Sequence, residues 1–125
     1  MFRPVLVLVG AAAVGALLLS TVAFGQSSAA KKLKGTVGPG YTISLTQNGK
    51  KVKTLKAGTY KFVISDKASI HNFVVEQEKG GKFEKDLTSV SFMGTKTVSV
   101  KLKKGKWKYY CAPHESQMFG LFKVT

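Results

Sequence analysis

The sequence predicts an all-β domain, a β-sandwich with Greek-key connections, from three observations. The chain has 125 residues, which is enough for one domain. Short segments alternate with glycine-bearing turns, a spacing typical of short strands. Within these segments apolar residues recur at every second position, which buries one face of each strand, as in antiparallel sheets. Two sheets that stack on their apolar faces follow from this pattern. The turns are Gly38-Pro39-Gly40, Asn48-Gly49, Ala57-Gly58, Gly80-Gly81, Met93-Gly94 and Lys104-Gly105.

The first element is an export segment. Residues 4–25 contain no charged side chain, and Arg3 supplies the positive charge in front of them. The small residues around Ala23-Phe24-Gly25 indicate a signal peptide over residues 1–25. A stretch of 22 uncharged residues is also long enough to span a bilayer, so an uncleaved anchor over residues 4–25 is the alternative. Either interpretation places the domain outside the cytoplasm, in the periplasm, on the cell envelope or secreted.

The remaining elements follow in chain order. Residues 26–32 are small and polar and predict a flexible linker, and the domain is expected over residues 33–125. Residues 76–90 are the least regular part, where we expect a short helical turn or a long loop. The residues expected to face inward are Ile43, Leu45, Tyr60, Phe62, Ile64, Val98, Val100, Leu102, Phe122 and Val124. Those expected to face solvent are Thr42, Ser44, Lys61, Thr97, Ser99, Lys101 and Lys123.

The scarcest side chains gather in one short segment. The chain contains two His, one Cys and three Met. Cys111, His114 and Met118 lie in a single run, and His71 lies upstream at the start of a strand-like stretch. A thiolate, two imidazoles and a thioether are the ligand set of a mononuclear blue copper site, in which the thioether is a weak axial donor.

Strand parity supports the same grouping. His71 shares its expected strand face with Phe73 and Val75, and Cys111 shares its face with Trp107 and Tyr109. Both side chains are therefore expected to point into the apolar interior at one end of the sandwich. The turn after Cys111 would then fold the remaining two donors back over the metal.

The chain resembles the cupredoxins, the type 1 blue copper proteins, and within them the plastocyanin and pseudoazurin group. The resemblance is clearest from Gly58 to Val124, in Gly-Thr-Tyr-Lys-Phe, in Ile-His-Asn-Phe and in the run that leads into Cys111. It implies one type 1 copper ion. It also implies four ligands, namely His71, Cys111, His114 and Met118.

The resemblance also implies neighbours that tune the metal. In many relatives the residue corresponding to Asn72 bonds a Ser or Thr side chain just after the cysteine. Ala112 stands at that position here, so this side-chain bond is expected to be absent, and Asn72 is expected to find another acceptor or to face water. The backbone N–H of Asn72 is expected to approach the Cys111 sulfur, whereas Pro113 has no N–H to offer, which leaves one hydrogen bond on sulfur.

Each ligand candidate also has an ordinary structural interpretation. A lone exported cysteine is often a small buried hydrophobe, and a single histidine is often a core residue satisfied by the backbone. Met118 could belong to the core, with Gln117 as an oxygen donor in its place, although a soft thioether suits Cu(I) better. A Cys/His nucleophilic pair would need a third orienting group, and the sequence shows none, so we expect no enzyme.

The expected function is one-electron transfer at the copper ion. In the family the electron passes through the edge of the histidine corresponding to His114, which surfaces within an apolar patch. The alternative is an extracytoplasmic copper-binding or delivery protein, which exposed clusters of Met and His would favour. The candidates for this patch lie in turns, so the alternative is that these residues only form the turns. They are Gly38, Pro39, Met93, Gly94 and Phe119.

The charge is strongly positive and indicates the kind of partner. The formal net charge is +14, from 20 Lys and Arg against 6 Asp and Glu. Such a field favours an acidic redox protein as electron donor or acceptor, or an anionic membrane surface. Nucleic-acid binding is not expected, because the protein is exported and offers no open stacking platform. The domain is expected to be a monomer.

Overall fold

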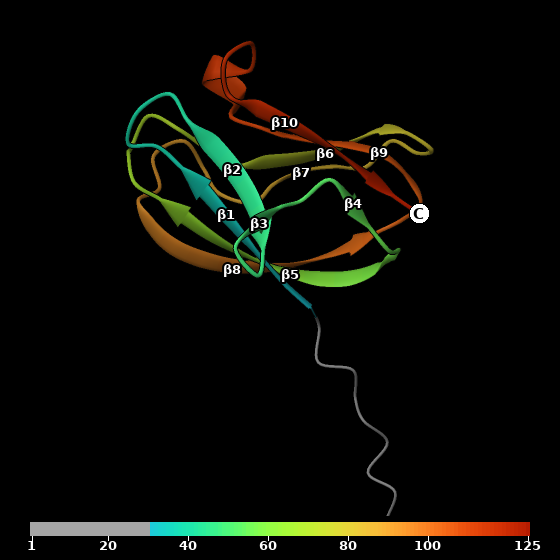
Figure 1. The fold of residues 1–125 in the computed structure, drawn as a ribbon. Helices are drawn as coiled ribbons and strands as arrows, with labels where there is room; N and C mark the ends of the chain where they lie inside the picture. Colours follow the sequence, from blue (N-terminus) through green and yellow to red (C-terminus); the bar gives the residue numbers. More distant parts are fainter. Residues whose placement is uncertain (1–30) are drawn as a thin grey trace, which may run out of the picture.

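The computed structural model describes residues 31–125, which form two five-stranded sheets packed face to face (Figure 1). The predicted all-β sandwich is therefore confirmed. The expected signal peptide or anchor, residues 1–25, and most of the expected linker lie outside the described residues. Within residues 31–125 no helix has the length and apolar character needed to cross a membrane.

Each sheet is built from strands that are distant in sequence. Sheet A has the order β3 (Lys50–Lys51), β2 (Ile43–Gln47), β1 (Lys31–Val37), β5 (Gly58–Asp66) and β8 (Gly94–Leu102). Sheet B has the order β4 (Thr54–Leu55), β10 (Phe119–Val124), β9 (Gly105–Tyr110), β6 (Val74–Lys79) and β7 (Glu84–Asp86). The chain crosses repeatedly between the sheets, as Greek-key connections require.

The expectation of purely antiparallel sheets is wrong. β1 pairs with β5 in parallel, and β10 pairs with β4 in parallel. The reason is that the chain leaves sheet A after β3 and returns through β4, so β5 runs in the same direction as β1. β1 also begins at Lys31, two residues before the expected domain start, because Lys31 and Lys32 pair with β5 although their side chains are exposed.

The alternation of buried and exposed residues is confirmed. The expected inward residues are buried, apart from Ile43 and Val98, which are partly buried against the core. The seven expected outward residues are all exposed. Residues 76–90 contain the rest of β6, the short strand β7 and a loop, and no helical turn.

Aromatic rings fill the space between the sheets near one end. Tyr109 stacks on Phe73 with ring centroids 5.7 Å apart, and Trp107 stacks on Phe122 at 6.1 Å. Gly120 permits the position of Tyr109, because a Cβ atom on Gly120 would overlap the Tyr109 ring. The aromatic cluster therefore anchors β9, which Cys111 follows directly, and the segment before β6 that carries His71 and Phe73.

The strand register gathers four loops at one end of the sandwich. In sheet A it aligns the end of β1, the end of β5 and the start of β8 through Val37, Asp66 and Gly94. In sheet B it aligns the start of β6, the end of β9 and the start of β10. These four loops, which lie at the upper left of Figure 1 and are called the loop end below, are residues 38–42, 67–73, 87–93 and 111–118.

Candidate metal centre

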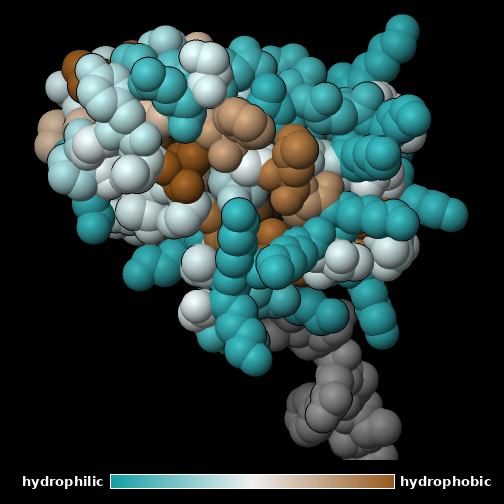
Figure 2. Space-filling view, turned by 45° about the horizontal axis from the view of Figure 1, so that its top comes forward, coloured by the Kyte–Doolittle hydropathy of each residue, from teal (hydrophilic) through white to brown (hydrophobic). Residues whose placement is uncertain are grey.

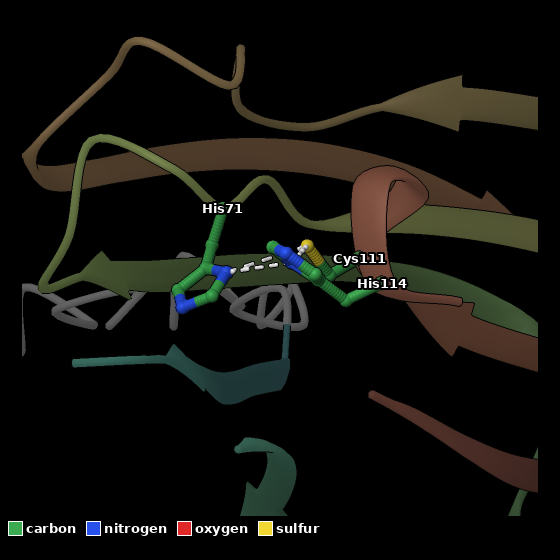
Figure 3. Close-up of side chains that lie close together, drawn as sticks. All are labelled: His71, Cys111 and His114. Carbon is green, nitrogen blue, oxygen red and sulfur yellow. Dashed lines mark hydrogen bonds between the residues drawn. The ribbon is translucent and has the colours of Figure 1, made fainter. Parts of the chain in front are cut away.

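Three potential metal donors meet at the loop end (Figure 3). The Nδ1 atoms of His71 and His114 are 3.2 Å apart. The Cys111 Sγ lies 3.7 Å from the Nδ1 of His71 and 3.6 Å from the Nδ1 of His114. The three side chains come from two separate loops and aim these atoms at one common point.

The loop after β9 is closed by backbone hydrogen bonds that place two of the donors. Cys111 directly follows β9, and its N–H donates to the Met118 carbonyl at 3.0 Å. A single 3-10 turn, Ala112–His114, follows, with Pro113 near its start. The Met118 N–H then donates to the His114 carbonyl at 2.8 Å. The thiol and the second imidazole are thereby fixed on one rigid turn.

His71 is fixed by a second loop, which crosses from sheet A to sheet B. It is fully buried in the loop between β5 and β6. Gly38 leaves room for it, because a Cβ there would lie 3.0 Å from the His71 Cδ2, and Gly38 has a φ of +73°. The neighbouring Phe73 N–H donates to the buried Thr88 Oγ1 at 2.9 Å, an anchor that the sequence analysis did not identify.

The three donor atoms fit one metal ion. A triangle with sides of 3.2, 3.6 and 3.7 Å has a point about 2.0 Å from every corner, which is the length of a metal–nitrogen bond and within about 0.3 Å of a metal–thiolate bond. A thiolate with two imidazoles is the trigonal donor set of type 1 copper. In the absence of metal, the same distances allow a proton on one ring nitrogen to be shared with its neighbours.

Met118, the expected fourth ligand, closes the ligand loop through its backbone bonds to Cys111 and His114. Its side chain is fully buried and belongs to the hydrophobic core, whereas Gln117 is exposed. The exposed amide of Gln117 is the less suitable donor of the two.

Asn72 bonds the residue after the cysteine through the backbone of that residue. Ala112 has no hydroxyl for the side-chain bond, and its backbone N–H donates to the Asn72 Oδ1 at 2.7 Å. A backbone donor thus replaces the side-chain donor. Among the hydrogen bonds of the described residues, the expected one from the Asn72 N–H to the Cys111 Sγ is not formed. Asn72 therefore joins the two ligand-bearing loops through its side chain.

A buried carboxyl group lies near the far side of His71. Asp66 is 2% exposed, and its Oδ1 accepts the Ala68 N–H at 3.1 Å. Its Oδ2 has no hydrogen-bond partner among the described residues, and neither has the Nε2 of His71. Burial raises the pKa of the Asp66 carboxyl, while the Ala68 N–H and the nearby His71 lower it.

Tyr41 covers the two histidines from the solvent side and was not identified from the sequence. Its ring centroid lies 4.8 Å from that of His114 and 5.7 Å from that of His71, both in edge-to-face geometry. Tyr41 remains 58% exposed, and the adjacent Ile70 is 50% exposed. An aromatic residue within the Gly38–Thr42 turn was the signal that could have pointed to it.

The expected patch residues lie at the loop end, as does the partly buried His114. Gly38 does not belong to the surface, because it is buried against His71. The other four expected residues are exposed, namely Pro39, Met93, Gly94 and Phe119. Tyr41 and Ile70 are exposed at the same end, so the exposed surface of the loop end includes several apolar side chains.

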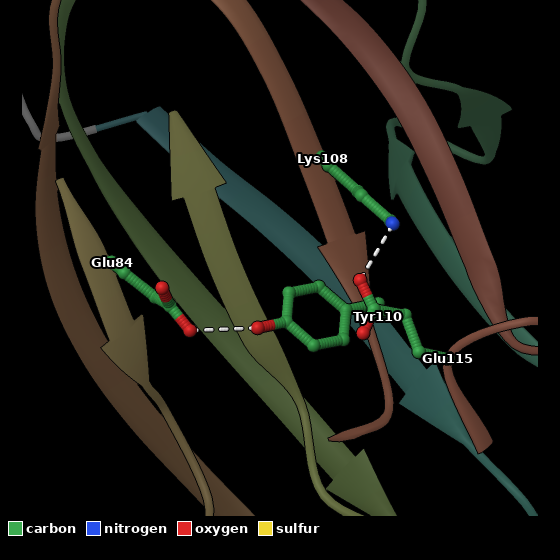
Figure 4. Close-up of polar contacts among 4 residues, drawn as sticks. All are labelled: Glu84, Lys108, Tyr110 and Glu115. Carbon is green, nitrogen blue, oxygen red and sulfur yellow. Dashed lines mark hydrogen bonds and ion pairs between the residues drawn. The ribbon is translucent and has the colours of Figure 1, made fainter. Parts of the chain in front are cut away.

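Beside this surface one ion pair connects β9 to the ligand loop (Figure 4). Lys108 Nζ lies 2.8 Å from Glu115 Oε1, and this hydrogen bond raises the pKa of Lys108. Tyr110 Oη donates to Glu84 at 2.7 Å and so connects β9 to β7. Burial is the main cause that raises the pKa of Tyr110, and the hydrogen bond to Glu84 is the second. Lys108 also lies 5.2 Å from the ring centroid of Phe119.

Comparison with known proteins assigns the metal. The copper binding proteins of the plastocyanin/azurin family match residues 42–125. Reduced rusticyanin superimposes with a TM-score of 0.52 and 18% identity over 75% of this chain and 76% of that one. A rusticyanin mutant gives 0.51 and 18% over the same shares. A copper(I) structure of an amicyanin mutant gives 0.49 and 12% over 75% and 82%.

No curated protein sequence matches this chain. The two likenesses to rusticyanin, at these identities, support the sandwich fold. The sequence match covers the whole ligand-bearing part of the domain, and the three clustered donors agree with one type 1 copper. The chain therefore belongs to the plastocyanin/azurin family of copper-binding proteins.

Proposed function

We propose that this protein carries single electrons at one copper ion held by His71, Cys111 and His114, with Met118 as the weak fourth ligand. The observation that carries the proposal is the triangle formed by the Nδ1 atoms of His71 and His114 and the Sγ of Cys111. Its size fits a single metal ion. Copper bound in this way supplies a one-electron couple. The rest of the function depends on how the chain holds the site.

The chain holds the donors in a geometry that changes little between the two oxidation states. Cys111 and His114 are fixed by the closed loop, and Asn72 joins that loop to the one that carries His71. A donor set fixed in advance lowers the rearrangement that accompanies gain or loss of an electron. The site has three strong donors and a buried thioether, so no open position is provided for a substrate. This arrangement supports a carrier rather than an enzyme.

His114 provides the route for the electron. It is partly buried, whereas His71, Cys111 and Met118 have no exposed surface. Its ring therefore bridges the buried centre and the exposed apolar surface. That surface would contact the redox partner through the exposed residues Pro39, Tyr41, Met93, Gly94 and Phe119.

The burial of the donors also weighs against copper delivery. Transfer of a metal ion to another protein needs ligands that the acceptor can reach and replace one at a time. Three of the four proposed ligands are fully buried here. An electron can leave such a site through His114, whereas the ion cannot leave without opening the loop.

Export and an acidic redox partner complete the proposal. The uncharged run of residues 4–25 supports export to the periplasm or cell envelope. The excess of lysine supports attraction to an acidic partner over a long range. The apolar surface around His114 would then make the close contact.

The copper spectrum tests the site. The Cu(II)-loaded protein is expected to show an intense thiolate-to-copper absorption band and a narrow parallel hyperfine splitting in EPR. Both should disappear in Cys111→Ser. Met93→Leu is the matched control, because Met93 is exposed and is not a proposed ligand, so its spectrum should be unchanged.

Electron exchange distinguishes the two functions. Stopped-flow mixing with a redox partner should show rapid oxidation and reduction, while incubation with a copper-free acceptor protein should leave the copper in place. Transfer of the metal without exchange of the electron would refute the carrier function and support delivery.

A further inference from the structure

The lysines are distributed unequally between the two sheets. Sheet A contains eight lysines and one acidic residue, Asp66, which is buried. The other five acidic residues all lie on β6, on β7 or in the ligand loop. The lysines of sheet A are Lys31, Lys32, Lys34, Lys50, Lys51, Lys61, Lys96 and Lys101.

Several of these lysines share the outer face of sheet A. Lys32 and Lys34 alternate with the buried Leu33, so both point away from the core. Lys61 on β5 stands directly beside Lys32 in the register. Lys101 on β8 is the outward neighbour of the buried Val100. Like charges on neighbouring strands repel each other, so this arrangement destabilises the free domain.

The described residues offer these lysines no internal counter-charge. The one ion pair within residues 31–125 joins Lys108 to Glu115 on the other sheet. Lysines on β3 have a structural explanation, because β3 is an edge strand and lysines on an edge strand prevent it from pairing with another chain. This explanation does not apply to the lysines on β1 and β5, which are inner strands. An external anionic surface does explain them.

The positive charge also lies away from the metal centre. The loop end carries one lysine, Lys67, and one exposed acid, Glu115. In Figure 2 hydrophilic side chains crowd the right side and the region around the grey chain, whereas the side over the loop end is paler. The turns and strand ends opposite the loop end add Lys53, Lys56, Lys103, Lys104, Lys106 and Lys123.

The position at which the chain enters the fold indicates the kind of partner. β1 begins at Lys31, at the end opposite the metal centre. The uncharged residues 4–25 precede it in the sequence, separated by residues 26–30. Five residues reach at most about 18 Å when extended. The lysines of β1 therefore lie within a short tether of the one segment in this sequence that is apolar enough to enter a bilayer.

We propose that the outer face of sheet A, centred on Lys32, Lys34, Lys61 and Lys101, binds an anionic lipid bilayer. Charge complementarity and the position of the chain entry both support this partner. Lysines near an anionic bilayer are attracted over about one Debye length, about 10 Å at 0.1 M salt, so the contact is sensitive to salt. Bound in this way, the domain directs the metal centre away from the lipid and leaves the surface around His114 free.

Lysine acetylation in vesicles tests this proposal on the copper-loaded full chain. The chain is reconstituted in phosphatidylcholine vesicles with or without about 30% phosphatidylglycerol, so that the apolar segment enters both alike. Mass spectrometry then measures the acetylation rate of each lysine. Lys61 and Lys101 should react several-fold more slowly in the anionic vesicles at low salt and recover at high salt. Lys67 at the loop end should react equally in both.

Two charge-matched variants locate the surface. One combines Lys32→Gln, Lys61→Gln and Lys101→Gln, and the control combines Lys79→Gln, Lys82→Gln and Lys85→Gln on the acidic side of sheet B. The first should lose the protection of Lys34 and the control should retain it. Both should keep the copper spectrum, because all six positions lie outside the metal centre.

Three results would overturn the proposal. Equal acetylation in neutral and anionic vesicles would show that the face does not touch the lipid. Equal loss of protection in both variants would show that net charge alone attracts the domain. Protection by a soluble acidic protein but not by the anionic vesicles would identify a protein as the partner. None of these results would alter the copper spectrum, so the proposed electron-carrier function is tested separately.

Discussion

Replacement of Asn72 by alanine should loosen the contact between the two ligand-bearing loops. The Asn72 side chain is 2% exposed, and its Oδ1 accepts the Ala112 N–H at 2.7 Å. The alanine variant removes the partner of this N–H, which belongs to the exposed Ala112, so water can replace part of the bond. Loss of such a part-buried hydrogen bond costs about 0.5–1.5 kcal/mol of the free energy of unfolding.

The expected loss is large enough to measure. In a domain of this size 1 kcal/mol corresponds to roughly 4–8 °C in Tm. With a loss of about 1 kcal/mol, the Tm of the metal-free protein should fall by roughly 4–8 °C. Copper affinity should also fall by about 10–100-fold, as is typical when a residue that orients a metal ligand is removed.

Differential scanning calorimetry and competition with a copper chelator measure the two effects. Thr46→Val is the matched control, because the Thr46 hydroxyl makes an exposed hydrogen bond of 3.5 Å, so its loss should change the stability by less than about 0.5 kcal/mol. A metal-free Asn72→Ala protein with the Tm of the parent would refute the reasoning, since the bond would then contribute nothing to the fold.

The remaining predictions concern the core and the surroundings of the histidines. Gly120→Ala should lower the free energy of unfolding in urea by about 1–3 kcal/mol, because its Cβ would overlap the Tyr109 ring, whereas Gly40→Ala, which has open space, should have little effect. Asp66→Asn should stabilise the metal-free protein at pH 7, because burial raises the pKa of the carboxyl and the folded state disfavours its ionised form. Since this penalty disappears once Asp66 is protonated, the difference in urea stability should shrink as the pH falls and vanish below about 3.9; a constant difference would contradict this. Tyr41→Ala should cost about 1 kcal/mol in urea unfolding through loss of its edge-to-face contacts, while Tyr41→Phe should be neutral; equal losses would assign the effect to the hydroxyl.

The sandwich could be predicted from the sequence because each strand buries one face. Tyr60, Phe62 and Ile64 alternate with exposed residues, and the structure buries all three. The pairing direction could not be read in the same way, since alternation is identical in parallel and antiparallel strands. The parallel pairing of β1 with β5 depends instead on where the chain crosses between the sheets.

The donors of the site were identifiable for a chemical reason. His71, Cys111 and His114 are scarce residue types in this chain, and strand parity places them at one end. The contacts around the donors were harder to predict from the sequence, because they depend on the backbone. The bond to Asn72 uses a backbone N–H that every residue except proline has, so the identity of Ala112 did not indicate whether this bond forms. Tyr41 reaches the histidines only because the Gly38–Thr42 turn folds over them.

The separation of lysines from the loop end makes the molecule a permanent electric dipole. β5 spans nine residues, so the lysine-bearing turns opposite the loop end, with Lys56, Lys103 and Lys104, lie about 30 Å from the loop end along the strand. A negatively charged electrode would therefore attract the wrong end and exchange electrons slowly. An electrode coated with an uncharged alkyl layer would contact the apolar surface around His114 and give fast voltammetry. The orientation of the protein, rather than its copper chemistry, would then set the measured rate.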